Sequence, residues 1–338
     1  MRAISRHTFI SCLINSVGKS YPFNHCSIHA YSITMSHFSP LPPISPVTKF
    51  KPSANLSFLW PDVGFGFGSH IEKYRLASKF GFAFIESMFP PPDVTLEMMK
   101  EAQTRYGLSQ MLINTEAGDN YGYAAVKGKQ AEFQASFNKT LHYARELGIR
   151  NIHVMAGKVT SLRSEEEKQA AYNTMRDNLT WACSQVDRVD TGIKILIEPI
   201  NRYSIPNYYL SDYDTALRLI DEINGENGNT LRLQLDFFHA QMICGDLTHL
   251  VERCRNVIGH VQIAQAPHRQ EPQARGEINY SYIFDMLRRV NYRGYIGLEY
   301  KPTLSSSSSP DMKNTEDGLL SFRQTYEEDF EWDKPTTG

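Results

Sequence analysis

Residues 194–203 read KILIEPINRY, a stretch in which an apolar run stops at a single acidic side chain. Apolar and mostly β-branched residues are typical of a buried strand, and Pro199 favours the end of the strand at that point. A carboxylate at the end of a buried strand is unfavourable unless it is paired, hydrogen-bonded or bound to a metal. The stretch therefore predicts a buried strand that delivers Glu198 to a functional site.

Seven further runs of the same kind occur along the chain, and segments with helical periodicity lie between them. The runs are ANLSFL from residue 54, FAFIES from 82, SQMLINT from 109, NIHVMAG from 151, LRLQLDF from 231, IGHVQIAQ from 258 and YIGLEY from 295. Gly107 and Gly148 follow two of the helical segments and Ser211 precedes a third, as expected at helix ends. Eight strands alternating with about eight helices predict a (β/α)8 TIM barrel.

The N-terminal segment differs in composition from the rest of the chain. The first 61 residues contain no Asp or Glu but include Arg2, Arg6, Lys19 and many serines. We divide the chain into an extension over residues 1–50 and a single (β/α)8 barrel domain over residues 51–338. The extension fits a mitochondrial transit peptide, a disordered tail of a cytoplasmic protein, or a start codon assigned too early, with Met35 as a later candidate.

Composition narrows the class of protein. The chain has 338 residues, of which 41% are hydrophobic, and a formal net charge of -2, so it lacks the basic field that would attract nucleic acid. Its five cysteines are scattered without CxxC spacing, which favours an intracellular, reducing compartment over a disulfide framework or a zinc ribbon. No apolar run approaches the length of about 20 residues that a membrane span needs. Homo-oligomerisation stays open.

A glycine-rich segment, DVGFGFGSH at residues 62–70, raises the alternative of an open nucleotide-binding sheet. Its glycines follow a GxGxG spacing rather than GxGxxG, and the nearest acidic strand end, Glu86, does not fit the nucleotide-binding arrangement. We interpret the segment as a flexible loop over the barrel mouth. No nucleotide cofactor is expected.

Oxygen-bearing side chains stand near the carboxyl ends of the last four predicted strands. They are Glu198, Asp236, Gln262 and Glu299. Barrel enzymes place their chemistry at this end, and three converging carboxylates would repel one another without a cation. A divalent metal that prefers oxygen ligands, Mg²⁺ or Mn²⁺, would compensate them. Each residue taken singly could instead cap a helix or lie in a solvated loop.

Donor side chains follow the same strand ends. His239 comes three residues after Asp236, the pair His268 and Arg269 follows the seventh strand, and Lys158 follows the fourth. Such donors suit a small anionic or carbonyl substrate. Each of them alone is also compatible with an ordinary surface position.

Ordered motifs now carry a resemblance. LIEPIN, LDFFHAQ, GHVQIAQ, PHRQEP, GEINY and GLEYKP, preceded by LINTEAGDN and HVMAGKV, are similar to the hydroxypyruvate isomerase family over roughly residues 53–302. The resemblance implies an isomerase of glyoxylate and carbohydrate metabolism that interconverts hydroxypyruvate and 2-hydroxy-3-oxopropanoate (tartronate semialdehyde). It also implies that Glu198 and Glu299 are the catalytic acid and base, and that Asp236 and Gln262 complete the polar or metal centre. The family resembles the wider xylose-isomerase-like TIM barrels.

Three alternatives remain beside this interpretation. An epimerase or isomerase of a small keto-sugar would use the same centre, although ketose epimerases usually have a histidine where this chain has Gln262. A metal-dependent endonuclease on this fold would need several histidine ligands and a basic groove. A non-catalytic barrel that serves as a binding scaffold would not require Glu198 and Glu299.

Overall fold

Eight parallel strands close into a barrel in the order β1 to β8. The computed structural model describes residues 49–64, 67–160, 162, 164–189, 192–225, 228–303 and 313–332. Residues 1–48, and with them nearly all of the predicted N-terminal extension, lie outside this part of the chain. The predicted (β/α)8 barrel is confirmed.

The strands lie within the predicted apolar runs, except that β1 begins three residues earlier and shares only Ala54 and Asn55 with ANLSFL. They are β1 (Lys51–Asn55), β2 (Phe84–Ser87), β3 (Ser109–Asn114), β4 (Asn151–His153), β5 (Lys194–Ile197), β6 (Leu231–Asp236), β7 (Ile258–Ile263) and β8 (Tyr295–Leu298). β1 pairs with β8 through Ser53 and Gly297, among other positions, and this pairing closes the barrel.

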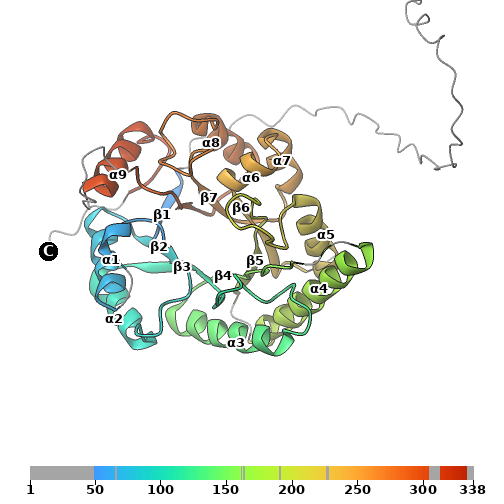
Figure 1. Cartoon of the computed structure of the whole chain (residues 1–338). Coiled ribbons are helices and arrows are strands. Elements are labelled where there is room, and N and C mark those ends of the chain that lie inside the picture. Colours follow the sequence, from blue (N-terminus) through green and yellow to red (C-terminus); the bar gives the residue numbers. More distant parts are fainter. Residues whose placement is uncertain are drawn as a thin grey trace, which may run out of the picture. The chain divides into compact units, whose positions relative to one another are not determined.

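Helices surround the strands as an outer ring (Figure 1). The structure describes the short 3₁₀ helix η1 (Pro61–Val63) and α1 (Phe67–Lys79), α2 (Leu96–Tyr106), α3 (Gln130–Leu147), α4 (Glu165–Arg188), α5 (Tyr213–Asn224), α6 (Phe237–Ile243), α7 (Leu247–Cys254), α8 (Tyr280–Arg289) and α9 (Lys313–Thr325). α2 and α3 end at Gly107 and Gly148, as predicted, and both glycines adopt the left-handed conformation that a helix C-terminus favours.

Two local predictions were wrong. The glycine-rich segment is not a continuous loop, because η1 occupies Pro61–Val63 and α1 already begins at Phe67. The cap of α5 is Asp212 rather than Ser211, since the Asp212 carboxylate accepts the backbone N–H of Thr215 at 2.7 Å. A carboxylate in that position also interacts favourably with the positive end of the helix dipole.

Alternation along the strands separates a polar interior from an apolar outer layer. In β6, Leu231, Leu233 and Leu235 are fully buried, while Gln234 and Asp236 occupy the alternate positions. Successive side chains of a strand point to opposite faces, so the leucines face the helices and the polar residues face the barrel interior. The barrel axis is therefore lined with polar side chains near its carboxyl end.

The segment after α9 packs against the residue that precedes β1. Phe50 forms a parallel bridge with Phe330, and its ring also contacts Phe284 and Tyr292. The N–H of Phe50 donates to the carbonyl oxygen of Asp329 at 2.8 Å, and Glu331 donates to the carbonyl oxygen of Phe50 at 2.9 Å. The tail after α9 thus holds the start of β1 in place.

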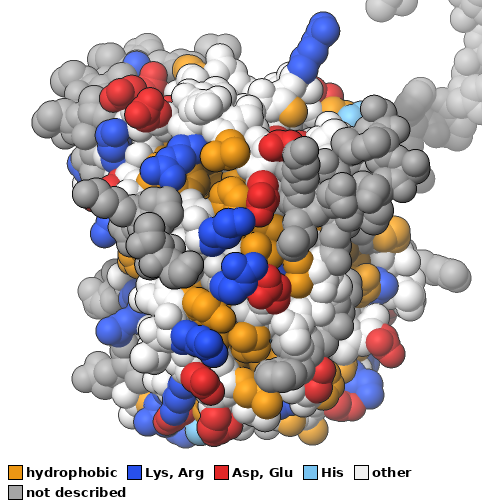
Figure 2. All heavy atoms as spheres, turned by 90° about the vertical axis from the view of Figure 1, so that its left-hand side faces the viewer, with side chains coloured by type: hydrophobic (Ala, Val, Ile, Leu, Met, Phe, Trp, Pro, Cys, Tyr) orange, Lys and Arg blue, Asp and Glu red, His pale blue; other side chains and the backbone are white. Residues whose placement is uncertain are grey.

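The outer surface carries charges of both signs. On the side where α1 and α9 lie, acidic and basic side chains are interleaved among apolar ones (Figure 2). Pairs such as Arg75 with Glu72 and Lys79 with Glu316 belong to this pattern. Within the described residues, none of the helices is both long and apolar enough to cross a membrane.

Candidate active site

The four predicted strand-end residues meet at the mouth of the barrel. Glu198 directly follows β5, Asp236 ends β6, Gln262 lies in β7 and Glu299 directly follows β8. Glu198, Asp236 and Gln262 are almost completely buried. Gln234, which also points inward, joins two of the four, because its side-chain amide donates to Glu198 Oε2 at 3.0 Å and to Gln262 Oε1 at 2.6 Å.

Arg269 joins the other two. Its Nη2 lies 3.0 Å from Asp236 Oδ2 and 3.1 Å from Glu299 Oε2. The guanidinium lies near two aromatic rings, 4.4 Å from the ring centre of Phe58 and 5.0 Å from that of Phe238. An arginine held by rings and carboxylates in this way presents a fixed positive charge at the barrel mouth.

Burial of so many acids changes their protonation. Burial raises the pKa of Glu198 well above its usual value, and the charges of Glu299 and Asp236 raise it further. Burial also raises the pKa of Glu299 to about 8, although the charge of Arg269 lowers it. Burial raises the pKa of Asp236 as well, and again the charge of Arg269 opposes the shift. One arginine therefore does not neutralise the carboxylates, and the site favours holding either a proton or an additional cation.

His239 lies beside these carboxylates at the start of α6. Its Nδ1 accepts the backbone N–H of Asn201 at 3.2 Å and the side-chain amide of the same residue at 2.7 Å. Its Nε2 lies 3.7 Å from Asp236 Oδ2 and 3.9 Å from Glu198 Oε1. Burial lowers the pKa of His239 well below its usual value, and Arg269 and His153 lower it further. The neutral ring therefore carries its hydrogen on Nε2 and points a donor into the site.

Ligand atoms of Glu198, Asp236 and His239 lie within 4.8 Å of one another, a grouping that could hold a metal ion. Two features fit a cation: Glu198 Oε1 is buried without a hydrogen-bond partner among the described residues, and the neighbouring acids have raised pKa values. His239 fits less well, because an Nε2 that carries a hydrogen has no lone pair for a metal. Gln262 Oε1 keeps a second lone pair beside the one that Gln234 occupies.

The two remaining predicted substrate-binding residues lie apart from this cluster. The Lys158 ammonium stands 4.2 Å from the ring centre of Tyr121, and its backbone forms an antiparallel bridge with Tyr208. His268 is exposed beside Arg269. Among the residues that the structure describes, neither forms an ion pair with Glu198, Asp236 or Glu299.

Sequence reasoning missed a second polar layer inside the barrel. Glu86 in β2 is completely buried and accepts from His260 Nε2 at 2.8 Å and from Gln262 Nε2 at 2.7 Å. The signal was present in FIES at residues 84–87, since Glu86 follows an apolar run as Glu198 does. Glu86 was considered only as a possible nucleotide-binding acid, so its place in the barrel interior was not predicted.

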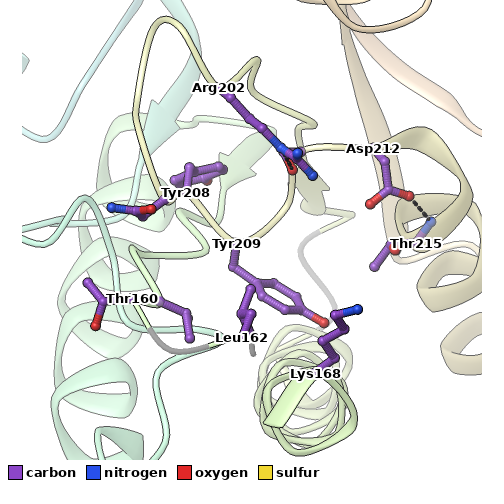
Figure 3. Close-up of a pocket in the computed structure, with 11 residues that line it drawn as sticks. Thr160, Leu162, Lys168, Arg202, Tyr208, Tyr209, Asp212 and Thr215 are labelled. Atoms are coloured by element: carbon purple, nitrogen blue, oxygen red, sulfur yellow. Dashed lines mark hydrogen bonds between the residues drawn. The ribbon is translucent and has the colours of Figure 1, made fainter. Parts of the chain in front are cut away.

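A cavity of about 520 Å³ lies beside the mouth, between the segments that follow β4 and β5 (Figure 3). Lys168, Arg202 and Tyr209 contribute to its lining, and none of the predicted site residues does. Lys168 is paired with Glu165 at 2.6 Å, and Asp212 is engaged in capping α5. The cavity lacks the convergent carboxylates of the barrel mouth, so we place the chemistry at the mouth.

Comparison with known proteins agrees with the fold. The family model described as xylose isomerase-like TIM barrel matches residues 74–325. The chain belongs to this family. Within the xylose isomerase-like TIM-barrel family, the hydroxypyruvate isomerase of Escherichia coli (strain K12) is 36% identical over 260 residues, which cover 76% of this chain and 95% of the relative. The 2-oxo-tetronate isomerase of Haemophilus influenzae is 35% identical over 256 residues, covering 75% of this chain and 93% of the relative.

Solved structures share the barrel fold of this chain. A structure described as AP endonuclease, family 2, from Brucella melitensis is 33% identical, with a TM-score of 0.71 and coverage of 81% of this chain and 98% of the other. The D-psicose 3-epimerase of Clostridium cellulolyticum H10 has a TM-score of 0.68 at 14% identity, covers 83% of this chain and 99% of its own, and shares the fold. The resemblance to hydroxypyruvate isomerases and the isomerase class are confirmed by the curated relatives.

Proposed function

We propose that the protein interconverts hydroxypyruvate and 2-hydroxy-3-oxopropanoate by proton transfer through an enediolate. The observation that carries the proposal is a pair of glutamates with raised pKa values, the buried Glu198 and the partly exposed Glu299, beside a fixed arginine at the barrel mouth. The proposal also draws on the Escherichia coli relative named hydroxypyruvate isomerase, which is 36% identical.

The reaction needs two proton movements on carbon and one between oxygens. A base removes a proton from the CH₂OH carbon beside the ketone, an acid adds a proton to the former ketone carbon, and the hydroxyl proton passes to the other oxygen. Glu198 and Glu299 supply the base and the acid. Two carboxyls whose charges interact titrate as a pair, so one of them remains protonated while the other is ionised.

Other side chains at the mouth bind and orient the substrate. The Nε2–H of His239 can donate to a substrate oxygen, and its neutral state avoids protonating the intermediate prematurely. Arg269 attracts the substrate carboxylate, with His268 and Lys158 further out around the mouth. A small anionic substrate is therefore the expected partner, and a formal net charge of -2 gives no overall basic field for nucleic acid.

A divalent cation, Mg²⁺ or Mn²⁺, fits the oxygen donors Glu198, Asp236, Gln262 and Glu299 better than it fits the donor nitrogen of His239. When bound, such a cation would stabilise negative charge on the substrate oxygens. It would also compensate carboxylates that a single arginine leaves partly unneutralised.

A direct assay tests the proposed function. Purified protein is incubated with hydroxypyruvate in deuterated water, and nuclear magnetic resonance follows the appearance of 2-hydroxy-3-oxopropanoate. The same assay is repeated after chelation and after addition of Mg²⁺ or Mn²⁺. We expect turnover that chelation lowers and added metal restores. Absence of turnover in every metal condition would refute the assignment.

The second candidate substrate is 2-oxo-tetronate, because 2-oxo-tetronate isomerases are as similar to this chain as the hydroxypyruvate isomerases are. Both substrates combine a 2-oxo group with a carboxylate, so Arg269 suits both. The ratio of kcat/KM values for the two acids distinguishes them. Tagatose and fructose serve as neutral controls for the weaker epimerase alternative.

A further inference from the structure

Glu86 is a buried carboxylate that the proposed proton transfer does not use. It belongs to β2 and has no exposed surface. Three donors surround it: Asn55 Nδ2 at 3.0 Å and Gln262 Nε2 at 2.7 Å from Oε1, and His260 Nε2 at 2.8 Å from Oε2. The bonds to β7 pass through the barrel interior, because β8 and β1 lie between β7 and β2 in the sheet.

Gly297 in β8 makes room for this contact. A Cβ atom at Gly297 would lie 2.3 Å from Glu86 Oε1 and 2.4 Å from Oε2, distances that real Cβ atoms do not reach. Gly297 is also the register partner of Gln262 across the β7–β8 pair. The side chain missing from β8 therefore leaves the space that the Glu86 carboxylate occupies.

The carboxylate determines which way Gln262 points. Both carboxyl oxygens of Glu86 accept hydrogen bonds from neighbouring donors, and Gln262 turns its NH₂ group toward Glu86 and its own Oε1 the other way. Gln262 Oε1 then accepts a hydrogen bond from Gln234 Nε2 at 2.6 Å. The NH₂ group of Gln234 also donates to Glu198 Oε2 at 3.0 Å. One buried acid thus fixes two amides in series, and the series ends on a proposed catalytic carboxylate.

We propose that Glu86 is a positioning residue, which holds the carbonyl oxygen of Gln262 on the metal-binding side and, through Gln234, orients Glu198. This inference rests on the proposed metal-assisted function. Outer partners of metal ligands typically change metal affinity or activity about 10–100-fold when removed. The inference predicts that Glu86 affects the affinity for a cation that it does not itself contact.

The first experiment measures Mn²⁺ binding by isothermal titration calorimetry on the full-length, metal-free protein. Wild type, Glu86→Ala, Gln262→Ala and the double variant form a thermodynamic cycle. We expect Glu86→Ala to raise the Kd for Mn²⁺ about 10–100-fold, and to add little to the loss already caused by Gln262→Ala. Additive losses, or an unchanged Kd with only a lower melting temperature, would reduce Glu86 to a structural role and overturn the inference.

A second pair of variants tests the same idea without deleting the carboxylate. Gly297→Ala forces the Glu86 carboxylate aside and should weaken Mn²⁺ binding as Glu86→Ala does. The variant that combines Gly297→Ala with Glu86→Ala should bind Mn²⁺ no worse than Glu86→Ala alone. Gly68→Ala is the matched control, because a Cβ at that helical position meets nothing within 4 Å. If Glu86→Ala does not fold, this comparison decides the question, and normal Mn²⁺ binding by Gly297→Ala contradicts the inference.

A conservative variant separates hydrogen bonding from charge. Glu86→Gln keeps an oxygen that can accept from Gln262 and offers an NH₂ group to His260, whose Nδ1 has no hydrogen-bond partner among the described residues and can take the ring hydrogen. We expect this variant to bind Mn²⁺ nearly as wild type does. A loss as large as that of Glu86→Ala would contradict positioning through the acceptor oxygen.

Turnover of hydroxypyruvate is measured separately, so that the two proposals can fail independently. If the variants change the Kd for Mn²⁺ as predicted but wild-type protein does not turn over hydroxypyruvate, the positioning role stands and the substrate assignment fails. Wild-type protein that turns over hydroxypyruvate but binds no Mn²⁺ would overturn the positioning role and leave the isomerase function intact.

Discussion

Arg269 Nη2 lies 3.0 Å from Asp236 Oδ2, so that a single guanidinium nitrogen bridges the ends of β6 and β8 through its second contact with Glu299. The nearby rings of Phe58 and Phe238 limit where the guanidinium can move. The positive charge is therefore part of the site's architecture, and its removal should affect both substrate binding and the protonation of the carboxylates.

We expect Arg269→Ala to raise the KM for hydroxypyruvate by about 10-fold or more, because a hydrogen bond to a charged group contributes about 1.5–3 kcal/mol. Arg269→Lys keeps the charge but not the forked geometry and should give an intermediate effect. Steady-state kinetics with hydroxypyruvate and with a neutral keto-sugar measure the difference. Equal increases in KM for both substrates would show that the arginine is structural.

Glu198→Gln and Glu299→Gln should each retain the fold and lose about 10²- to 10⁴-fold in kcat, because Gln preserves size but cannot carry the proton. The double variant should be little worse than either single variant, since the two residues act as a unit. Exchange of carbon-bound hydrogen with deuterated solvent assigns the roles: loss of the base stops exchange, while loss of the acid permits exchange without product. Near-normal turnover by both single variants would refute proton transfer by this pair.

The raised pKa of Glu299 predicts a particular dependence of stability on pH. A carboxyl whose folded-state pKa is about 8, against 4.5 when unfolded, stabilises the fold below pH 4.5, and this contribution is lost as the pH rises through 8. Buried neutral histidines such as His153, with a pKa lowered to about 3 by burial, act in the opposite direction only below their unfolded pKa near 6.5. In chelator, the melting temperature should therefore fall between pH 6.5 and 8.

Two comparisons check this pH dependence. Glu299→Gln cannot titrate and should show a smaller fall in melting temperature between pH 6.5 and 8. Added Mn²⁺ should oppose the fall for wild type, because metal binding needs ionised carboxylates. A melting temperature that stays flat or rises over this interval in chelator would contradict the assignment.

Asp212→Ala should lower the free energy of unfolding by about 1 kcal/mol, because the N–H of Thr215 loses its side-chain acceptor at the start of α5. Ser211→Ala is the matched control at the neighbouring position and should change stability much less. Denaturant titration of the two variants measures both effects. A larger loss for Ser211→Ala would restore the serine cap that the sequence suggested.

The barrel and the four strand-end residues could be predicted because both depend on short-range patterns. Apolar runs mark the strands, and the carboxyl ends of parallel strands share one end of a barrel, so Glu198 and Asp236 had to approach each other. Glu86 escaped prediction because its role depends on contacts across the barrel, and above all on the absence of a side chain at Gly297, about 210 residues later in the chain.

The remaining errors have local causes. Ser211 and Asp212 are adjacent and both can cap a helix, so the sequence alone does not decide which side chain turns toward the free N–H groups of α5. The glycines at residues 64–68 suggested a loop, but α1 begins among them at Phe67, because tertiary packing outweighs the modest helix-breaking tendency of glycine.

The pairing of β1 with β8, and of Phe50 with Phe330, also determines when the protein can finish folding. One edge of β1 pairs with β2, which follows closely in the sequence, but its other edge must wait for β8, which is the last strand to be synthesised. Until then the open edge of β1 is available to other chains. The barrel therefore cannot close before β8 has been made, and the exposed edge of β1 is most open to pairing with other chains in the interval before that.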